Sequence, residues 1–192
     1  MGFSEDSKVD VEEIDETDVN WKLLKELKYT GKTDLFVTEL PMDTDFASVP
    51  KVFVWFLPRY GRYTKAAILH DYLWRKAVPE GRITRLQADA LFRRAMRDLH
   101  VAFLRRWIMW AAVRWGALTK PDARKDWWKE SWRVVLVTLV ALPIVLPPAV
   151  LIVIALLLFY LLELLFWVPL RIAHAIRPRK NVNLPRFRLK LG

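Results

Sequence analysis

Apolar and polar residues alternate over short stretches in the first quarter of the chain. The stretches 21–29 and 34–40 are rich in apolar and β-branched residues, and a short turn containing Gly31 separates them. This arrangement is typical of a β-hairpin, because glycine fits the backbone angles of a tight turn. The segment 41–50 contains two prolines, and since a residue before proline avoids the helical region, it predicts an irregular loop. We therefore expect a β-hairpin or small sheet followed by a loop.

Three later stretches show the spacing of amphipathic helices. In the first, 63–78, apolar residues recur every three or four positions until Pro79 ends the pattern. The second opens with Thr84 and Gln87, which fit a capping box, and continues with an apolar stripe. The third, 103–118, is rich in tryptophan and arginine. Its apolar stripe favours packing in the core, and the alternative is a helix that lies on a membrane interface with its arginines at the headgroups.

A long apolar run dominates the last third of the chain. There are 37 residues between Arg133 and Arg171, and among them only Thr138 and Glu163 are neither apolar nor aromatic. A run of this length and composition is typical of a membrane segment. As one helix it would extend about 55 Å, whereas the hydrocarbon core of a bilayer is about 30 Å thick. One straight span is therefore a poor fit.

Prolines divide this run into two arms. Pro147 and Pro148 separate 134–146 from 149–170, and the second arm is long enough to span a bilayer alone. Two membrane arrangements follow: a transmembrane or re-entrant hairpin that turns at the two prolines, or one span that follows an interfacial segment. Basic residues flank both ends of the run, so the positive-inside rule favours the hairpin with both ends in the cytoplasm. A hydrophobic hairpin buried in a soluble oligomer is the alternative without a membrane.

Aromatic and basic residues beside the run are of the types that occupy a membrane interface. Tryptophan rings prefer the headgroup level, and arginine and lysine bind anionic phosphates there. The segment 171–192 has seven basic residues and no acidic one. We expect it to bind anionic lipid headgroups, with nucleic-acid phosphates as the second candidate. The predicted membrane-facing and lipid-facing residues are Trp127, Trp128, Trp132, Trp167, Arg171, Arg177, Arg179 and Lys180.

Charge and composition refine the picture at the other end of the chain. The protein has 31 Lys and Arg against 21 Asp and Glu, yet residues 1–31 carry nine acidic residues and four lysines. Because the first 18 residues offer little apolar surface, we predict a disordered leader there. The chain contains no cysteine, which excludes disulfides, thiolate catalysis and cysteine-ligated metal sites.

Together these patterns predict an α+β fold. A small N-terminal β-hairpin or sheet packs on a helical bundle, and a C-terminal transmembrane or re-entrant helical hairpin follows. The length of 192 residues suits one compact domain with an appendage. The predicted segments are an acidic disordered leader (1–18), the α+β domain (19–120), an amphipathic linker (121–133), the membrane segment broken at Pro147-Pro148 (134–170) and a basic tail (171–192).

Four polar residues within the predicted domain are candidates for a chemical site. Asp45, His70 and Asp71 are residue types that ligate a divalent metal, which is the one cofactor that the sequence suggests. Asp45, His70 and Asp89 form a candidate general acid/base set. On a helix, His70 faces the apolar side while Asp71 points about 100° away, so these two do not chelate one ion as a simple pair. Asp89 lies at the edge of its apolar stripe, where an inward hydrogen bond to His70 or to the Asp45 loop can form.

A structural interpretation of the same residues requires no chemistry. Asp45 would satisfy backbone donors in its loop, and His70 would be a hydrogen-bonded core residue. Asp71 would pair with Arg75 one helical turn later. We favour this interpretation, because the chain has no HExxH helix, nucleophile elbow or phosphate-binding glycine loop.

The candidate residues occur in three motifs that follow one another along the chain. The sequence has TDFASVP at 44–50, LHDYL at 69–73 and an AD-x-x-F segment at 88–92. In this order the motifs resemble those of the phage-associated domain of unknown function family 1353, over roughly 21–116. One departure is 40–43, where the family more often has a Gly-Phe pair. The resemblance implies an origin in a phage or prophage and a domain that is not a known enzyme.

The resemblance and the apolar run lead to three hypotheses for function. The first is a phage-encoded accessory protein of the host inner membrane, with a cytoplasmic domain that binds another phage or host envelope protein in superinfection exclusion, assembly or lysis support. The second is a membrane-tethered, metal-dependent hydrolase using Asp45, His70 and Asp89, which predicts a concave pocket where the three side chains converge. The third is a virion component that inserts into the membrane during genome delivery.

Overall fold

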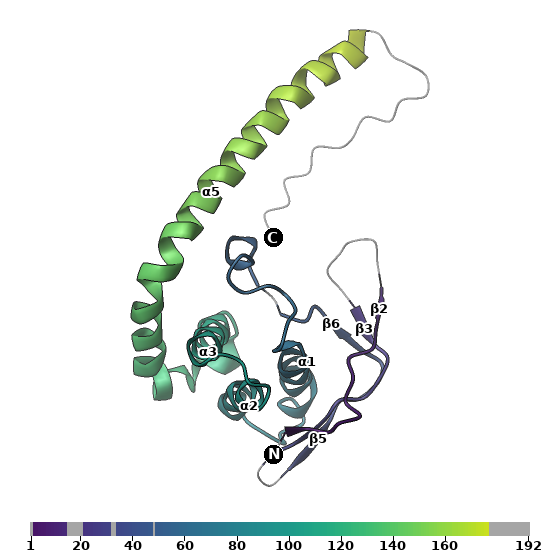
Figure 1. Ribbon diagram of the computed structural model, residues 1–192, viewed down its shortest axis with the longest axis vertical. Helices are drawn as coiled ribbons and strands as arrows, with labels where there is room; N and C mark the ends of the chain where they lie inside the picture. Colours follow the sequence, from purple (N-terminus) through teal and green to yellow (C-terminus); the bar gives the residue numbers. More distant parts are fainter. Residues whose placement is uncertain (1, 15–20, 32–33, 48, 177–192) are drawn as a thin grey trace.

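The protein has an α+β domain with a long helix along one side. The computed structural model describes residues 2–14, 21–31, 34–47 and 49–176. Short strands cover one side of a central group of three helices, and the long helix α5 (Ser131–Ile176) lies on the other side and extends beyond the domain (Figure 1). The predicted fold class is therefore confirmed.

Six short strands form two antiparallel sheets of three strands each. One sheet has the order β1-β4-β5 and the other the order β2-β3-β6. The predicted hairpin is confirmed by the pairing of β4 with β5, in which Tyr29 lies opposite Phe36. The stretch 21–29, however, contributes two strands to different sheets. The strands are β1 (Gly2–Phe3), β2 (Val11–Glu13), β3 (Trp21–Leu23), β4 (Lys28–Thr30), β5 (Leu35–Val37) and β6 (Met42–Thr44).

The prediction of a disordered leader over 1–18 is wrong for two of its segments. β1 pairs with β4, and β2 pairs with β3, so both belong to the folded domain. The ring of Phe3 lies 5.0 Å from the ring of the buried Tyr29. The partner strands satisfy the backbone groups of the acidic segment, and composition does not reveal such partners. Residues 15–18 of the predicted leader lie outside the described residues.

Three helices form the centre of the domain. α1 (Thr64–Tyr72) continues into a π-helical turn, η2 (Leu73–Ala77), and is followed by α2 (Arg85–Asp98) and α3 (Phe103–Ala117). The predicted capping box opens α2: Thr84 Oγ1 accepts from the Gln87 N–H at 3.2 Å, and Gln87 Oε1 accepts from the Thr84 N–H at 2.8 Å. The core joins strands to helices and includes Leu23, Leu27, Tyr29, Ile68, Leu69, Leu73, Ala88, Phe92, Ala95 and Met96.

The third helix is partly core and partly exposed. Its middle is buried at Met109, Trp110 and Ala111, as the favoured interpretation predicted. Its first turn is exposed at Phe103, which is 65% accessible, and Trp115 near the end is 41% accessible. The Trp115 Nε1–H donates to Thr138 Oγ1 at 2.9 Å, and α3 thereby contacts α5.

The apolar run forms one continuous helix, so the predicted hairpin at Pro147-Pro148 is wrong. After the short helices α4 (Pro121–Arg124) and η3 (Trp127–Glu130), α5 continues through four prolines: Pro143, Pro147, Pro148 and Pro169. Each proline removes one backbone donor and disfavours the preceding turn, but the remaining hydrogen bonds can hold a bent helix together. The curvature of α5 in Figure 1 is consistent with this accommodation.

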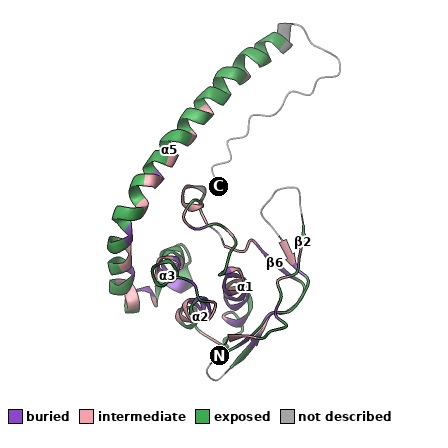
Figure 2. Ribbon diagram, in the orientation of Figure 1, coloured by how far each residue is buried: buried purple, intermediate pink, exposed green. Residues whose placement is uncertain are grey.

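One face of α5 packs on the domain and the rest of its surface is exposed. Val134 is fully buried, and Ala141 and Ala149 are buried further along the helix. Helix η1 (Lys51–Phe53), in the loop before α1, also contacts α5. Elsewhere on α5 most of the large apolar side chains are exposed (Figure 2). By length and composition, the helical segment Trp127–Ala173 can cross a membrane.

Candidate functional site

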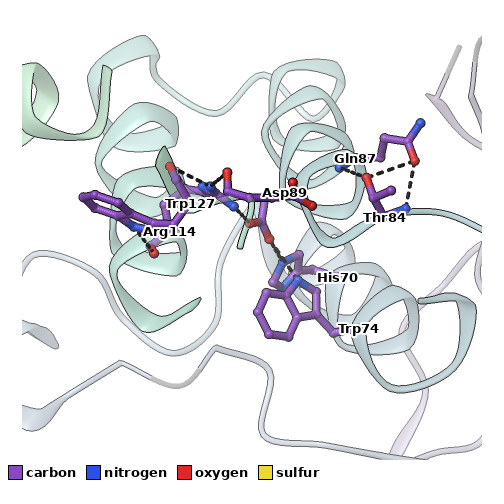
Figure 3. Close-up of polar contacts among 8 residues, drawn as sticks. His70, Trp74, Thr84, Gln87, Asp89, Arg114 and Trp127 are labelled. Atoms are coloured by element: carbon purple, nitrogen blue, oxygen red, sulfur yellow. Dashed lines mark hydrogen bonds and ion pairs between the residues drawn. The ribbon is translucent and has the colours of Figure 1, made fainter. Parts of the chain in front are cut away.

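The buried carboxylate of Asp89 is the centre of a polar cluster inside the domain. His70 Nε2 lies 2.9 Å from Asp89 Oδ1, and the Trp74 Nε1–H donates to the same oxygen at 2.9 Å. The other oxygen, Oδ2, accepts from Arg114 Nη1 at 3.1 Å (Figure 3). Asp89 is fully buried, and the His70 side chain is 12% exposed. Three helical elements, α1 with η2, α2 and α3, thus meet on one carboxylate.

Arg114 extends this cluster to the base of the long helix. Its Nη2 donates to the carbonyl oxygens of Asp126 at 3.1 Å and Trp127 at 3.3 Å, and the Trp127 Nε1–H donates to the Arg114 carbonyl at 2.9 Å. Both Arg114 and Asp89 are fully buried. A buried ion pair is stable only when hydrogen bonds satisfy its remaining polar atoms, and these two carbonyl oxygens accept hydrogen bonds from Nη2 of the guanidinium. The cluster therefore fixes the segment before α5 to the domain.

The local sequence explains why His70 and Trp74 reach the same carboxylate. They are four residues apart, and side chains at this spacing share one face of a helix. Their rings lie 5.6 Å apart, and the His70 ring also lies 4.8 Å from the Phe92 ring on α2. The π-helical turn begins at Leu73, between the two polar residues. Such turns often occur at functional positions, and here one carries the indole donor to Asp89.

A second polar cluster joins the loop after β6 to α1. The Thr44 hydroxyl donates to Asp71 Oδ2 at 2.9 Å and accepts from the Phe46 N–H at 3.0 Å. Phe46 has φ 62°, in the left-handed region that non-glycine residues rarely adopt. Burial, together with the negative charge of Asp45, raises the pKa of Asp71 to about 6. The loop thus contacts a carboxyl group on α1 whose pKa is raised well above its usual range.

The predicted site residues fall into these two clusters. The predicted inward hydrogen bond between His70 and Asp89 is confirmed. Asp45 and Asp71 interact electrostatically in the second cluster. Arg75, expected to pair with Asp71, donates to the carbonyl oxygen of Asp43 at 2.9 Å, and its charge also acts on Asp71, where it favours the ionised carboxylate. The role of these residues in catalysis stays a prediction.

The predicted metal ligands do not form a ligand set in the described part of the chain. Among the residues that the structure describes, no group of three or more histidine and acidic side chains is arranged to hold a metal ion. His70 directs Nε2 to Asp89, whereas Asp71 accepts the hydroxyl of Thr44. The two side chains leave α1 in different directions, as their adjacent positions on a helix require.

Sequence reasoning missed Arg114, which holds the first cluster together. The spacing contains a usable signal, because Trp110, Ala111 and Ala117 lie four and three residues before it and three after it, all on the same helix face. An arginine surrounded by apolar positions at helical spacing is a candidate for a buried ion pair.

The predicted lipid-facing residues divide into exposed and buried ones. Trp128 and Trp132 are 74% and 62% exposed, whereas Trp127 is only 4% exposed, so its assignment to the membrane interface is wrong. The Trp127 ring is held inside because its indole donates to a backbone carbonyl and lies 5.3 Å from the Trp115 ring. At the far end of α5, the Arg171 guanidinium lies 4.9 Å from the centre of the Trp167 ring. Arg177, Arg179 and Lys180 lie outside the described residues.

Comparison with known proteins gives one match. The model of the family described as "Protein of unknown function (DUF1353)" matches residues 21–113. No curated protein and no solved structure matches the chain significantly. The matched segment contains His70 and Asp89, and it ends one residue before Arg114. The family region thus contributes most of the polar cluster, and the arginine that connects it to the long helix follows directly after.

Proposed function

We propose, on the premise that residues 21–113 are a domain of the DUF1353 family, that this chain is a membrane-anchored protein that acts by binding a partner. The observation that carries this proposal is the occupied carboxylate of Asp89. Both of its oxygens accept hydrogen bonds from side chains, and the residue is fully buried. A general acid or base must come within hydrogen-bond reach of a substrate, and a buried carboxylate whose two oxygens already accept hydrogen bonds offers no such access.

The anchor in this proposal is the outer part of α5. Residues 150–170 would extend about 31 Å as a helix, close to the hydrocarbon thickness of about 30 Å. Arg171 follows this segment, where a charged side chain can reach the far headgroups. A cytoplasmic domain at the host inner membrane is part of the proposal and does not follow from the positive-inside rule, because a single span places the seven basic residues of 171–192 on the side opposite the domain. Four basic residues precede the apolar run on the domain side: Arg124, Lys125, Lys129 and Arg133.

The biological role in this proposal is that of a phage or prophage accessory protein. Its domain would bind another phage or host envelope protein during superinfection exclusion, assembly or lysis, while the basic residues from Arg171 onward bind anionic lipid headgroups. The support is the family match together with the apolar helix. The membrane location brings the domain to the surface that an infecting phage must cross.

The first experiment expresses the full chain in bacteria and measures membrane retention and phage plating efficiency together. The chain should remain in the membrane fraction after a carbonate wash and lower the plating efficiency of a challenging phage. The variant Leu157→Arg with Leu161→Arg places two charges in the span, at about 2.5–3.5 kcal/mol each, and should lose both effects. Leu157→Val with Leu161→Val is the matched control. Release of the unaltered chain by the wash would contradict anchoring, and retention without any effect on plating would contradict a role in exclusion.

A membrane-tethered hydrolase is the second candidate, and the Asp71 cluster is the observation that favours it. Groups with strongly shifted pKa values occur preferentially at catalytic sites, and burial together with Asp45 raises the pKa of Asp71 to about 6. The nearby Phe46, in the left-handed region, is the type of strained position found at such sites. The Asp45→Asn variant separates the two candidates in the plating assay described above. A loss of the effect on plating efficiency at an unchanged melting temperature would favour the hydrolase, whereas a retained effect would favour binding.

A further inference from the structure

The long helix is too long for the membrane to cover all of its apolar surface. α5 has 46 residues, so it extends about 69 Å, more than twice the hydrocarbon thickness of about 30 Å. If residues 150–170 span the bilayer, as the proposed function requires, residues 131–149 stand beside the domain. Val134, Ala141 and Ala149 are buried along this part of the helix, and α3 and η1 contact α5. The inner part of α5 is therefore outside the hydrocarbon core.

The outward face of this inner part is apolar and exposed. It includes Trp128 in η3, followed by five apolar residues of α5, and their exposed fractions lie between 41% and 74%. A groove of about 460 Å³ runs along this surface, formed by η3 and the first turns of α5. The residues of the outward face are Trp128, Trp132, Val135, Leu139, Leu142 and Leu146.

Lipid cannot cover this face while the domain remains in water. The headgroup region adds only about 5–8 Å on each side of the hydrocarbon core, whereas residues 131–149 extend about 28 Å. Tilting does not remove the excess. At the largest usual tilt of about 40°, the hydrocarbon core holds a helix of about 39 Å, or roughly 26 residues. Most of the outward face would still lie outside the membrane, so a protein surface must cover it.

We propose that a second copy of this chain covers the outward face, so that two α5 helices pair in parallel next to the membrane. Anchored copies share one orientation, and each presents the same face at the same height, which is the condition for a two-fold symmetric contact. The six residues follow one another at intervals of four, three, four, three and four. This spacing is that of a coiled-coil seam, and the shared membrane orientation makes the two helices parallel. The proposal rests on the membrane anchoring proposed above.

The charges beside the seam permit this pairing. Two copies in parallel bring like residues together, and unpaired cations at the seam would repel. Here Lys129 lies 2.6 Å from Asp126, and Arg133 lies 3.0 Å from Glu130, within each copy. These pairs neutralise the cations closest to the seam and lower the repulsion between the copies.

The exposed area is sufficient for a specific contact. A fully exposed tryptophan offers about 150–250 Å², so two tryptophans exposed by more than half, with four aliphatic side chains, give on the order of 600 Å² per copy. Two copies would then bury about 1,200 Å², which is the lower bound for specific protein interfaces. Pairing of the spanning segments 150–170 would add to this area.

The test is disulfide crosslinking in membranes, which the sequence favours because it contains no cysteine. Leu139→Cys places one thiol on the outward face, and Leu35→Cys is the matched control on β5, since the two leucines are 61% and 62% exposed. Washed membranes from cells expressing each full-length variant are oxidised and separated without reductant. We expect a reducible dimer with Leu139→Cys, no dimer above background with Leu35→Cys, and loss of the dimer when Trp132→Glu is added to Leu139→Cys.

Each other outcome overturns the pairing in a recognisable way. If Leu139→Cys gives no dimer while the chain resists the carbonate wash, pairing is wrong and the membrane anchor stands. If the same thiol gives no dimer and is also protected from a membrane-impermeant maleimide, lipid or another protein covers the face, and the pairing is again wrong. If the wash releases the chain, the anchor is wrong, and the pairing that depends on it is also wrong.

Discussion

Removing the carboxylate of Asp89 tests whether the buried cluster is structural. Asp89→Ala would leave the guanidinium of Arg114 buried without its negative partner, and would remove acceptors from His70 and Trp74. Both members of the ion pair are fully buried, so water cannot replace the lost carboxylate. We expect a large loss of stability from this single change.

The magnitude follows from the burial of both charges. Breaking a buried ion pair by removing one partner costs about 3–5 kcal/mol, a large share of the total stability of about 5–15 kcal/mol for a domain. For a domain of this size the melting temperature should fall by roughly 10–20 °C. Replacing the pair as a whole, with Asp89→Leu and Arg114→Met, should cost less than Asp89→Ala alone, because no unpaired charge remains.

The assay is thermal unfolding of the full chain in detergent, followed by tryptophan fluorescence. Ten tryptophans are present, and Trp74 and Trp127 belong to the cluster itself. Asp43→Ala is the matched control, because Asp43 is exposed and Arg75 binds its backbone oxygen, which the change retains. A melting temperature within about 3 °C of the unaltered protein for Asp89→Ala, equivalent to less than about 1 kcal/mol, would refute the structural role.

Three further measurements test other parts of the structure. His70→Ala should lower stability by about 1–3 kcal/mol, because it removes a hydrogen bond to a buried carboxylate. A loss of the effect on phage plating with an unchanged melting temperature would contradict this structural role. Asp71→Asn should abolish a pH dependence of stability. Burial and Asp45 raise the pKa of Asp71 in the folded protein from 3.8 to about 6. The unaltered protein should therefore lose up to about 3 kcal/mol of its free energy of unfolding as the pH rises from 4 to 6. The variant should show no such fall in melts between pH 4 and 8, and an identical fall would exclude Asp71 as its source. Thr84→Ala should cost about 1 kcal/mol through the lost cap of α2, whereas no change on chemical denaturation would show that the cap contributes little.

The sequence alone predicted several features that depend only on residues close together in the chain. Gly31 between two apolar stretches predicted the β4–β5 hairpin, and Thr84 with Gln87 predicted the start of α2, because turns and caps depend on residues close together in the chain. His70 was placed on an apolar helix face with Asp89 in reach, and both follow from helical periodicity. The apolar run likewise required only composition and length to be recognised.

Contacts between distant segments decided the remaining features. The segments 2–3 and 11–13 of the predicted leader became strands because β4 and β3 offered partners 8 to 28 residues later in the chain. Trp127 turned inward because Arg114 supplied a carbonyl acceptor. Neither partner is visible in the local pattern of either segment, since hydrogen-bond partners distant in sequence are set by packing.

The long helix shows most clearly the difference between what the sequence determined and what tertiary contacts decided. The sequence by itself determined that residues 134–170 are apolar enough for a membrane, and that Pro147 and Pro148 weaken a helix there. Whether the chain turns or continues at those prolines depends on what lies beside it. In the structure, α3 and η1 contact α5, and Val134, Ala141 and Ala149 are buried along one face. Packing along one side of the helix, which no local pattern encodes, supports the continuous α5.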